Sequence, residues 1–153
     1  MNRLKIIVWI VVSLVSGVII GGYLFSDSRP RSILALNNCS GTCLQANELL
    51  GLAASVGIQK FSGLAPSVVK ETDKTIVIEH PSPEARIHYL VIPKRDIKNI
   101  AGVSDADADY LMDAIKVSGE IIREKNLTHY RLITNGPGYQ GVTYLHFHLM
   151  SND

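Results

Sequence analysis

The sequence predicts an α+β domain, with an antiparallel sheet of about five strands and one long helix, preceded by an N-terminal transmembrane helix. Three observations predict it. Segments rich in β-forming residues at 68–71, 75–79 and 87–93 follow one another closely enough to pair as hairpins. A long amphipathic stretch comes next, and two more such segments end the chain. Strands in hairpins with one long interposed helix are typical of α+β folds.

The first apolar segment covers residues 6–25 and contains twenty residues without a charge. As a helix that rises about 1.5 Å per residue, it would cross a hydrocarbon core of about 30 Å. A cleaved signal peptide is the alternative, but its apolar region usually covers only about 7–15 residues and ends in a small-residue cleavage site. No such site is evident in the sequence, so we predict an uncleaved membrane anchor at residues 1–25.

Basic residues on the two sides of this segment predict its orientation. Arg3, Lys5 and the terminal amino group slightly outweigh Arg29 and Arg31. Basic residues tend to stay on the cytoplasmic side of a membrane. The small excess therefore favours a cytoplasmic N-terminus and a domain on the non-cytoplasmic side.

Residues 26–43 read as a polar linker that contains both cysteines of the chain, and residues 44–153 read as the folded domain. Cys39 and Cys43 are too few for a disulfide scaffold and wrongly spaced for a CxxC motif. Three states are open to them: a disulfide outside the cytoplasm, free thiols, or a metal site shared with histidines.

The elements of the domain follow from local patterns. A stretch rich in Leu and Ala at 44–60 predicts a short helix. Ser104 and the acidic residues after it predict the start of the long helix, and apolar residues at steps of three and four carry that helix over 105–124. The other expected elements are a turn at 73–74, a strand at 131–134, a tight loop at 135–141 and a last strand at 142–150.

The overall charge of the chain is close to neutral. Lys and Arg total 15 against 14 Asp and Glu. This balance gives no electrostatic reason to expect nucleic acid or an acidic macromolecule as a partner. A ligand of the size of a nucleotide is compatible with it.

The last predicted strand carries two histidines two residues apart. Period-two alternation places four side chains on one face of the sheet: Val142, Tyr144, His146 and His148. Leu145, Phe147 and Leu149 lie on the other face, which we expect to face the core. Two imidazoles at this spacing suit a nucleophile beside a hydrogen-bond donor to phosphate. A metal site or an ordinary polar face would give the same pattern.

Two longer motifs help to decide between these alternatives. Residues 87–97 read IHYLVIPKRDI and residues 140–150 read QGVTYLHFHLM. Together they resemble the signature segments of the histidine-triad (HIT) superfamily. Asn135 at the end of a strand and the SPEA turn at 82–85 match two further positions of that superfamily. The resemblance covers roughly residues 66–153 and implies a HIT-like fold.

The resemblance also implies a nucleotide hydrolase or transferase that cleaves a phosphoramidate or phosphoanhydride bond. His146 would be the nucleophile that forms a nucleotidyl-histidine, which water then hydrolyses. His148 would donate a hydrogen bond to phosphate, His88 would line the same pocket, and Asn135 and Gln140 would help to bind phosphate. This scheme requires no metal and no cofactor, and relatives are commonly homodimers with a continuous sheet.

The chain departs from the HIT pattern at three positions that we expect at the substrate-binding site. Tyr144 stands where the first histidine of the triad is usual, His80 where many relatives carry an aspartate that holds the ribose hydroxyls, and Gly141 where a phosphate-binding serine is common. A phenol is a poor proton carrier at neutral pH, so the hydrogen-bond relay of the triad would change. Two alternatives follow. One is a nucleotide-binding module with weakened catalysis, and the other is a hydrolase of lipid-linked nucleotides, such as a CDP-activated lipid, which the membrane anchor favours.

Overall fold

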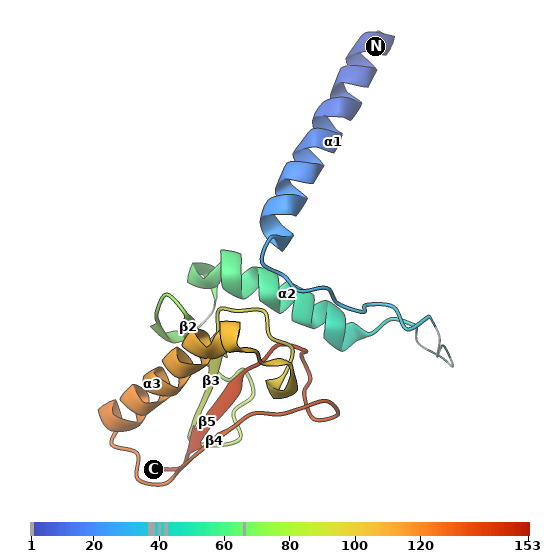
Figure 1. Cartoon of the computed structure of the whole chain (residues 1–153). Coiled ribbons are helices and arrows are strands. Elements are labelled where there is room, and N and C mark those ends of the chain that lie inside the picture. Colours follow the sequence, from blue (N-terminus) through green and yellow to red (C-terminus); the bar gives the residue numbers. More distant parts are fainter. Residues whose placement is uncertain (1, 37–38, 40, 42, 66) are drawn as a thin grey trace.

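A computed structural model of the chain describes residues 2–36, 39, 41, 43–65 and 67–153 (Figure 1). Residues 37, 38, 40 and 42 of the predicted linker, and residue 66, where the HIT resemblance begins, lie outside the described residues. The helices and strands are α1 (Arg3–Phe25), α2 (Ala46–Lys60), η1 (Ser62–Leu64), β1 (Val68–Glu71), β2 (Thr75–Glu79), β3 (Ile87–Pro93), η2 (Ile100–Gly102), η3 (Asp105–Asp107), α3 (Ala108–Glu124), β4 (Tyr130–Ile133) and β5 (Phe147–Ser151).

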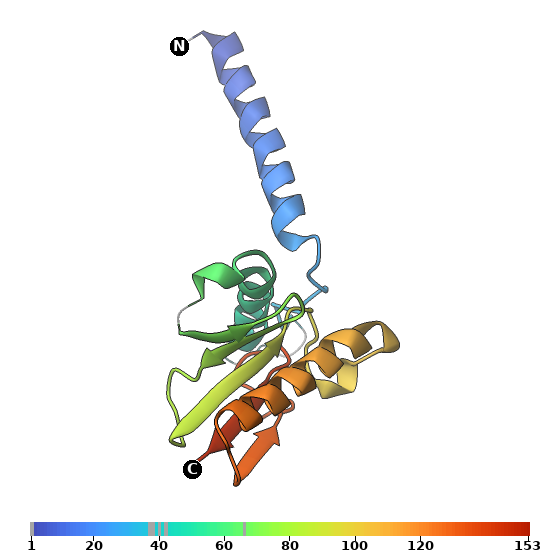
Figure 2. The same cartoon turned by 90° about the vertical axis from the view of Figure 1, so that its left-hand side faces the viewer.

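The strands form one five-stranded antiparallel sheet in the order β1-β2-β3-β5-β4, and helices cover both of its faces (Figure 2). Helix α3 packs on one face, where its Val117 and Ile121 meet Val77, Val91 and Leu149 of the strands. The predicted α+β fold with one long helix is therefore confirmed.

Helix α2 covers part of the opposite face. Ala54 and Ile58 of α2 pack against a cluster of Ile76, Ile92 and Tyr144. Ile76 and Val77 are neighbours on β2 and point to opposite faces, as alternation along a strand requires. The sheet is thus the middle layer between two helices that lie far apart in the sequence.

The predicted element bounds hold closely except at the last strand. The strands at 68–71, 75–79 and 87–93 are confirmed as β1, β2 and β3, whereas β5 begins only at Phe147 and not at residue 142. The backbone before it bonds to other parts of the domain: the Thr143 N–H donates to the Asn47 carbonyl (3.3 Å) and the Leu145 N–H to the Ile97 carbonyl (2.6 Å). These bonds draw residues 142–145 away from the ladder.

The start of the predicted linker is packed on the domain. Arg31 is buried and forms an ion pair with buried Asp96, and its guanidinium also donates to the Thr143 carbonyl. The Arg29 backbone N–H donates to the Asp96 carboxylate (2.7 Å), and the Arg29 guanidinium donates to both carboxylate oxygens of Asp107 (2.7 and 3.0 Å). These bonds fix the segment between α1 and the domain in one position.

Helix α1 extends away from the domain and buries none of its residues (Figure 1). It has 23 residues, and an 18-residue window within it has a mean hydropathy of 2.4, so it has the length and composition of a membrane-spanning helix, features that a signal sequence shares. Beyond the docked arginines, Cys39 and Cys43 are joined by a disulfide. Of the three states considered for these cysteines, the structure shows the disulfide.

Candidate active site

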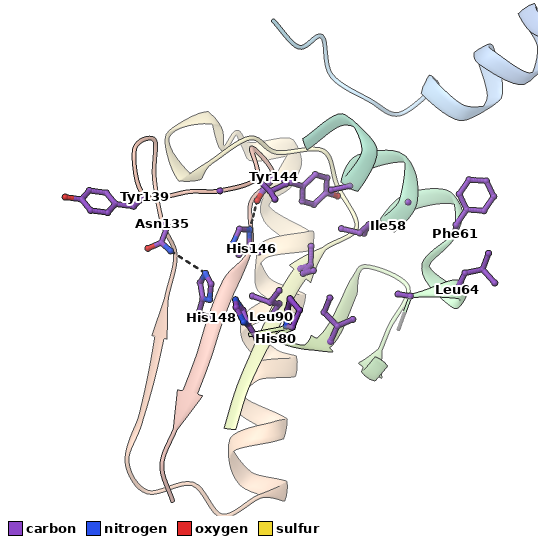
Figure 3. A pocket seen from close by; sticks show the side chains of 18 of the residues that line it. Ile58, Phe61, Leu64, His80, Leu90, Asn135, Tyr139, Tyr144, His146 and His148 are labelled. Atoms are coloured by element: carbon purple, nitrogen blue, oxygen red, sulfur yellow. Dashed lines mark hydrogen bonds between the residues drawn. The ribbon is translucent and has the colours of Figure 1, made fainter. Parts of the chain in front are cut away.

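A cavity of about 770 Å³ lies between α2 and the sheet face beneath it (Figure 3). Helix α2 and the turn that follows it form one wall. The other side carries the imidazoles of His80, His146 and His148. The cavity is therefore a pocket with a cluster of histidines on one side and a helix on the other.

His146 is held in the tautomer that a nucleophile needs. Its Nδ1 lies 2.7 Å from the backbone carbonyl oxygen of Tyr144, which can only accept a hydrogen bond, so Nδ1 carries the proton and Nε2 carries the free lone pair. Burial lowers the pKa of the His146 imidazole below its ordinary value of 6.5. Near neutral pH the ring is therefore uncharged and nucleophilic at Nε2.

His148 and His88 form a chain of hydrogen bonds with a defined direction. The Glu84 N–H donates to His88 Nδ1 (3.1 Å), which leaves the proton of the neutral His88 ring on Nε2. That N–H faces His148 Nδ1 at 2.9 Å and donates to it, so His148 keeps its own proton on Nε2. The Asn135 side-chain nitrogen lies 3.4 Å from this Nε2, and exchanging the oxygen and nitrogen of that amide turns an acceptor toward the His148 N–H. This series of hydrogen bonds orients the His148 Nε2–H as a donor at the edge of the pocket.

Burial and neighbouring imidazoles keep the rings of His148 and His88 uncharged. Burial, followed by repulsion from His146, His88 and His80, lowers the pKa of His148 to about 4. Burial, followed by repulsion from His80, also lowers the pKa of His88. Neutral imidazoles can be metal ligands or hydrogen-bond partners, so their tautomers decide which role fits.

His80 completes a cluster in which the ligand nitrogens of His80, His88 and His148 all lie within 4.8 Å of one another. Its ring stacks on His88 with centroids 4.0 Å apart, and the Ser82 N–H donates to His80 Nδ1 (3.0 Å). The Nδ1 lone pairs of His80 and His88 are both occupied by backbone N–H groups, which leaves protons on both Nε2 atoms. The cluster is thus better suited to donating hydrogen bonds to an anion than to holding a metal cation.

The Tyr144 side chain is buried and turns into the domain. Its hydroxyl donates to the Pro93 carbonyl (2.9 Å), and burial raises the pKa of the phenol. The group that contacts His146 is the backbone carbonyl of Tyr144. Replacing the usual first histidine by Tyr144 therefore leaves the tautomer of the nucleophile under backbone control.

The remaining predicted site residues divide into two groups. Asn135 and Gly141 line the pocket. Gln140 is buried, and its side-chain nitrogen donates to the carbonyls of Lys98 and Tyr144 (both 2.9 Å), so it braces the loop before β5. His88 lies beneath His148 and acts on the pocket through it.

Sequence reasoning missed the wall opposite the histidines. Ala54, Ile58 and Phe61 line the pocket from α2 and its end. The stretch was predicted as a helix, but its apolar residues are not restricted to one clear stripe. Its placement over the sheet follows from tertiary contacts such as that of Ile58 with the cluster around Ile92.

Comparison with known proteins places this geometry in a family. A family model described as "Scavenger mRNA decapping enzyme C-term binding" matches residues 60–153. An uncharacterized HIT-like protein of Chlamydia muridarum is 33% identical over 85 residues, which cover 54% of this chain and 68% of that protein. The chain belongs to this HIT-like family. Its HIT domain therefore accounts for the antiparallel sheet, the long helix and the histidines of the last strand.

Solved structures agree with this assignment. A HIT family hydrolase from Clostridium thermocellum is similar with a TM-score of 0.56 and 31% identity, covering 63% of this chain and 88% of that one. A histidine triad nucleotide-binding protein from Candida albicans is similar with a TM-score of 0.50 and 28% identity, covering 61% and 71%. The fold of the domain is thus that of the HIT family hydrolases.

Proposed function

We propose that the chain is a nucleotide hydrolase or transferase that cleaves a phosphoramidate or phosphoanhydride bond through a nucleotidyl-histidine at His146. The observation that carries this proposal is the hydrogen bond between His146 Nδ1 and the Tyr144 carbonyl, which leaves the Nε2 lone pair free on a pocket residue. The likeness to a HIT family hydrolase and to a nucleotide-binding relative supports the same reaction class.

The reaction proceeds in two displacements. His146 Nε2 attacks the α-phosphorus, a P–N(His) bond forms, and the bond from phosphorus to the leaving amine or phosphate breaks. The leaving group takes the bonding electron pair, and a leaving amine also takes a proton from solvent. Water then attacks phosphorus, the P–N(His) bond breaks, its electron pair returns to Nε2, and the proton lost by the attacking water passes to solvent as nucleotide is released.

The other imidazoles stabilise the charge that develops on the phosphate oxygens. The His148 Nε2–H is oriented by the chain that runs from the Glu84 N–H through His88. Such preorganised donors lower the barrier because they need no reorientation during the reaction. His80 adds a donor where many relatives carry an acid, so we expect ligand contacts on that side to involve acceptor groups such as phosphate oxygens.

The reaction is tested with the full chain, wild type and His146→Ala, incubated with an adenosine phosphoramidate. We expect product formation and an adenylylated protein mass in the wild type, both lost in His146→Ala by at least a thousandfold in rate. A matched control is His129→Ala, since His129 lies outside the pocket and is largely exposed. Turnover that survives in His146→Ala would contradict the nucleophile, and nucleotide binding without turnover in the wild type would favour a binding module with weakened catalysis.

A second substrate class is a lipid-linked nucleotide such as a CDP-activated lipid. The apolar helix α1, which we propose as a membrane anchor, favours it because an anchored site would stay close to lipid headgroups. A CDP-lipid included in the same assay distinguishes the two classes by which compound is consumed.

We also propose that the domain forms a homodimer with a continuous sheet. Strand β4 is an edge strand, and its Tyr130 and Ile133 are exposed. A second copy that pairs along this edge would satisfy its open hydrogen-bonding groups. Sedimentation of the full chain in detergent tests the proposal, and a single species of monomer mass would contradict it.

A further inference from the structure

The pocket has two ends of different chemistry. One end carries the imidazoles, and the other is formed by Ala54, Gly57, Ile58, Phe61, Leu64 and Ala65 of α2 and the turn after it. The side chains of this second end have no hydrogen-bonding groups. In Figure 3, Phe61 and Leu64 lie at the opposite end of the lining from Asn135 and His148. An occupant that fills the whole pocket must therefore be amphiphilic.

The apolar end is next to the base of helix α1. The Lys60 ammonium at the end of α2 donates to Ser26 (3.0 Å), pairs with Asp27, and lies 4.9 Å from the centroid of the Tyr23 ring. Phe61 follows Lys60 directly. These contacts hold the end of α2, where the apolar end of the pocket lies, beside the last turn of α1, and Figure 1 shows the two helices close together there.

The mouth of the pocket at its apolar end, formed by Phe61 and Leu64, is unusually apolar for a surface facing water. Phe61 is 46% exposed and Leu64 is 81% exposed, although both line the pocket. Exposed apolar groups at the mouth of a pocket mark a binding groove or a membrane-facing surface. Here both descriptions apply, because the mouth adjoins the proposed anchor.

We propose that this end of the pocket holds the apolar chain of a membrane lipid whose phosphate-bearing head reaches His146 and His148. The inference rests on the proposed function for its polar half and on the proposed anchor for the source of the lipid. A hydrocarbon chain needs no hydrogen-bond partner among these six residues, and it gains about fourfold in affinity for each methylene that it buries there.

The test uses the full chain in phosphatidylcholine nanodiscs and two compounds, the methyl and the octyl ester of adenosine 5′-diphosphate. Gly57→Phe places a ring in the apolar end, where an added Cβ meets no atom within 4 Å. Gly63→Phe makes the same change in η1, after the end of α2, outside the pocket lining and equally free of contacts at Cβ. Unchanged thermal midpoints would show that both variants fold.

We expect the wild type to prefer the octyl ester over the methyl ester by at least a hundredfold in kcat/KM. Gly57→Phe should reduce this preference at least tenfold, and Gly63→Phe should keep it. Equal use of the two esters by the wild type, or a preference that Gly57→Phe leaves unchanged, would overturn the inference while the hydrolase proposal stands.

A binding measurement separates the inference from catalysis. An octyl ester with a photoreactive diazirine at the end of its chain should crosslink to residues 54–65 in the wild type and in His146→Ala, and not in Gly57→Phe. Crosslinking there without any turnover would refute the proposed reaction and keep the lipid site. Crosslinking only to other segments would refute the lipid site.

Discussion

His148 shows how a few hydrogen bonds set the chemistry of one side chain. It accepts from His88 at Nδ1, stands among three other imidazoles, and is partly buried. Each of these features disfavours a positive charge on the ring. His148 therefore serves as a neutral donor to phosphate, and its charge state links the site to the stability of the domain.

This link predicts a loss of stability in mild acid. The pKa of His148 is about 4 in the folded domain, below its ordinary value of 6.5. Between these two values the unfolded chain binds a proton that the folded domain does not, so the free energy of unfolding falls as pH decreases from 6.5 to about 4. Urea unfolding of the full chain in detergent at pH 7 and pH 5 measures this loss.

The matched variant is His148→Asn, whose side-chain oxygen can still accept from His88 but does not titrate. We expect its urea midpoint to change less between pH 7 and pH 5 than that of the wild type. An equal change in both proteins would show that other groups carry the acid sensitivity.

The sequence identified which residues gather at the site better than it identified what each residue does. Alternation along the last strand predicted that His146 and His148 share a face, and the structure places both in the pocket. The tautomers could not be predicted, because they depend on distant backbone groups such as the Glu84 N–H. The same holds for Gln140, whose side-chain nitrogen donates to the carbonyls of Lys98 and Tyr144, while its contact with phosphate stays a prediction.

At the scale of elements, helix α2 depends on a close approach at Gly51. A Cβ added there would lie 2.4 Å from Thr143 Oγ1, 2.5 Å from the Arg31 guanidinium and 2.6 Å from the Thr143 carbonyl oxygen. The carbonyl belongs to the backbone and cannot rotate aside. Gly51 therefore lets α2 lie against the buried arginine that fixes the linker.

Two glycine variants in the same helix test this packing. Helix propensity alone would make Gly→Ala favourable by about 1 kcal/mol at either position. Because of the overlap with Thr143, Gly51→Ala should instead destabilise the domain by about 1–3 kcal/mol. Gly57→Ala, whose Cβ meets open space, should be neutral or stabilising. Urea midpoints give the comparison, and a stabilising Gly51→Ala would refute the proposed close packing.

The elements that the sequence predicted well are those whose pattern is local. Strands β1 to β3 end where their alternating or apolar runs end, and a capping box of Ser104 and Asp107 begins the short helix η3 that leads into α3. The late start of β5 could not be predicted, since residues 142–145 alternate like a strand. Their backbone groups bond to residues of α2 and of the loop after β3, which only the folded chain brings near.

For the whole molecule, the docked segment before α2 sets the position of the domain relative to α1. Arg31 and Asp96 form a buried ion pair, and the Arg29 backbone bonds to the same carboxylate. Removing either partner would leave the other charge buried and unpaired, at a cost of about 3–5 kcal/mol, so the attachment depends on both residues. If α1 spans a membrane, the pocket stays at a fixed height above the bilayer.

The same geometry makes the side of the membrane testable. Disulfides persist in oxidising compartments, so the bond between Cys39 and Cys43 agrees with a non-cytoplasmic domain, as the basic residues at the start of α1 also favour. If α1 is the uncleaved anchor that we propose, the full chain with an N-terminal tag, expressed in a bacterial host, should keep its tag in the membrane fraction. Protease added to intact spheroplasts should digest the domain, and a maleimide reagent should label the cysteines only after reduction.

Loss of the tag would identify α1 as a signal peptide. A protected domain with reactive thiols would place it in the cytoplasm, and the lipids within reach of the pocket would then be those of the inner leaflet.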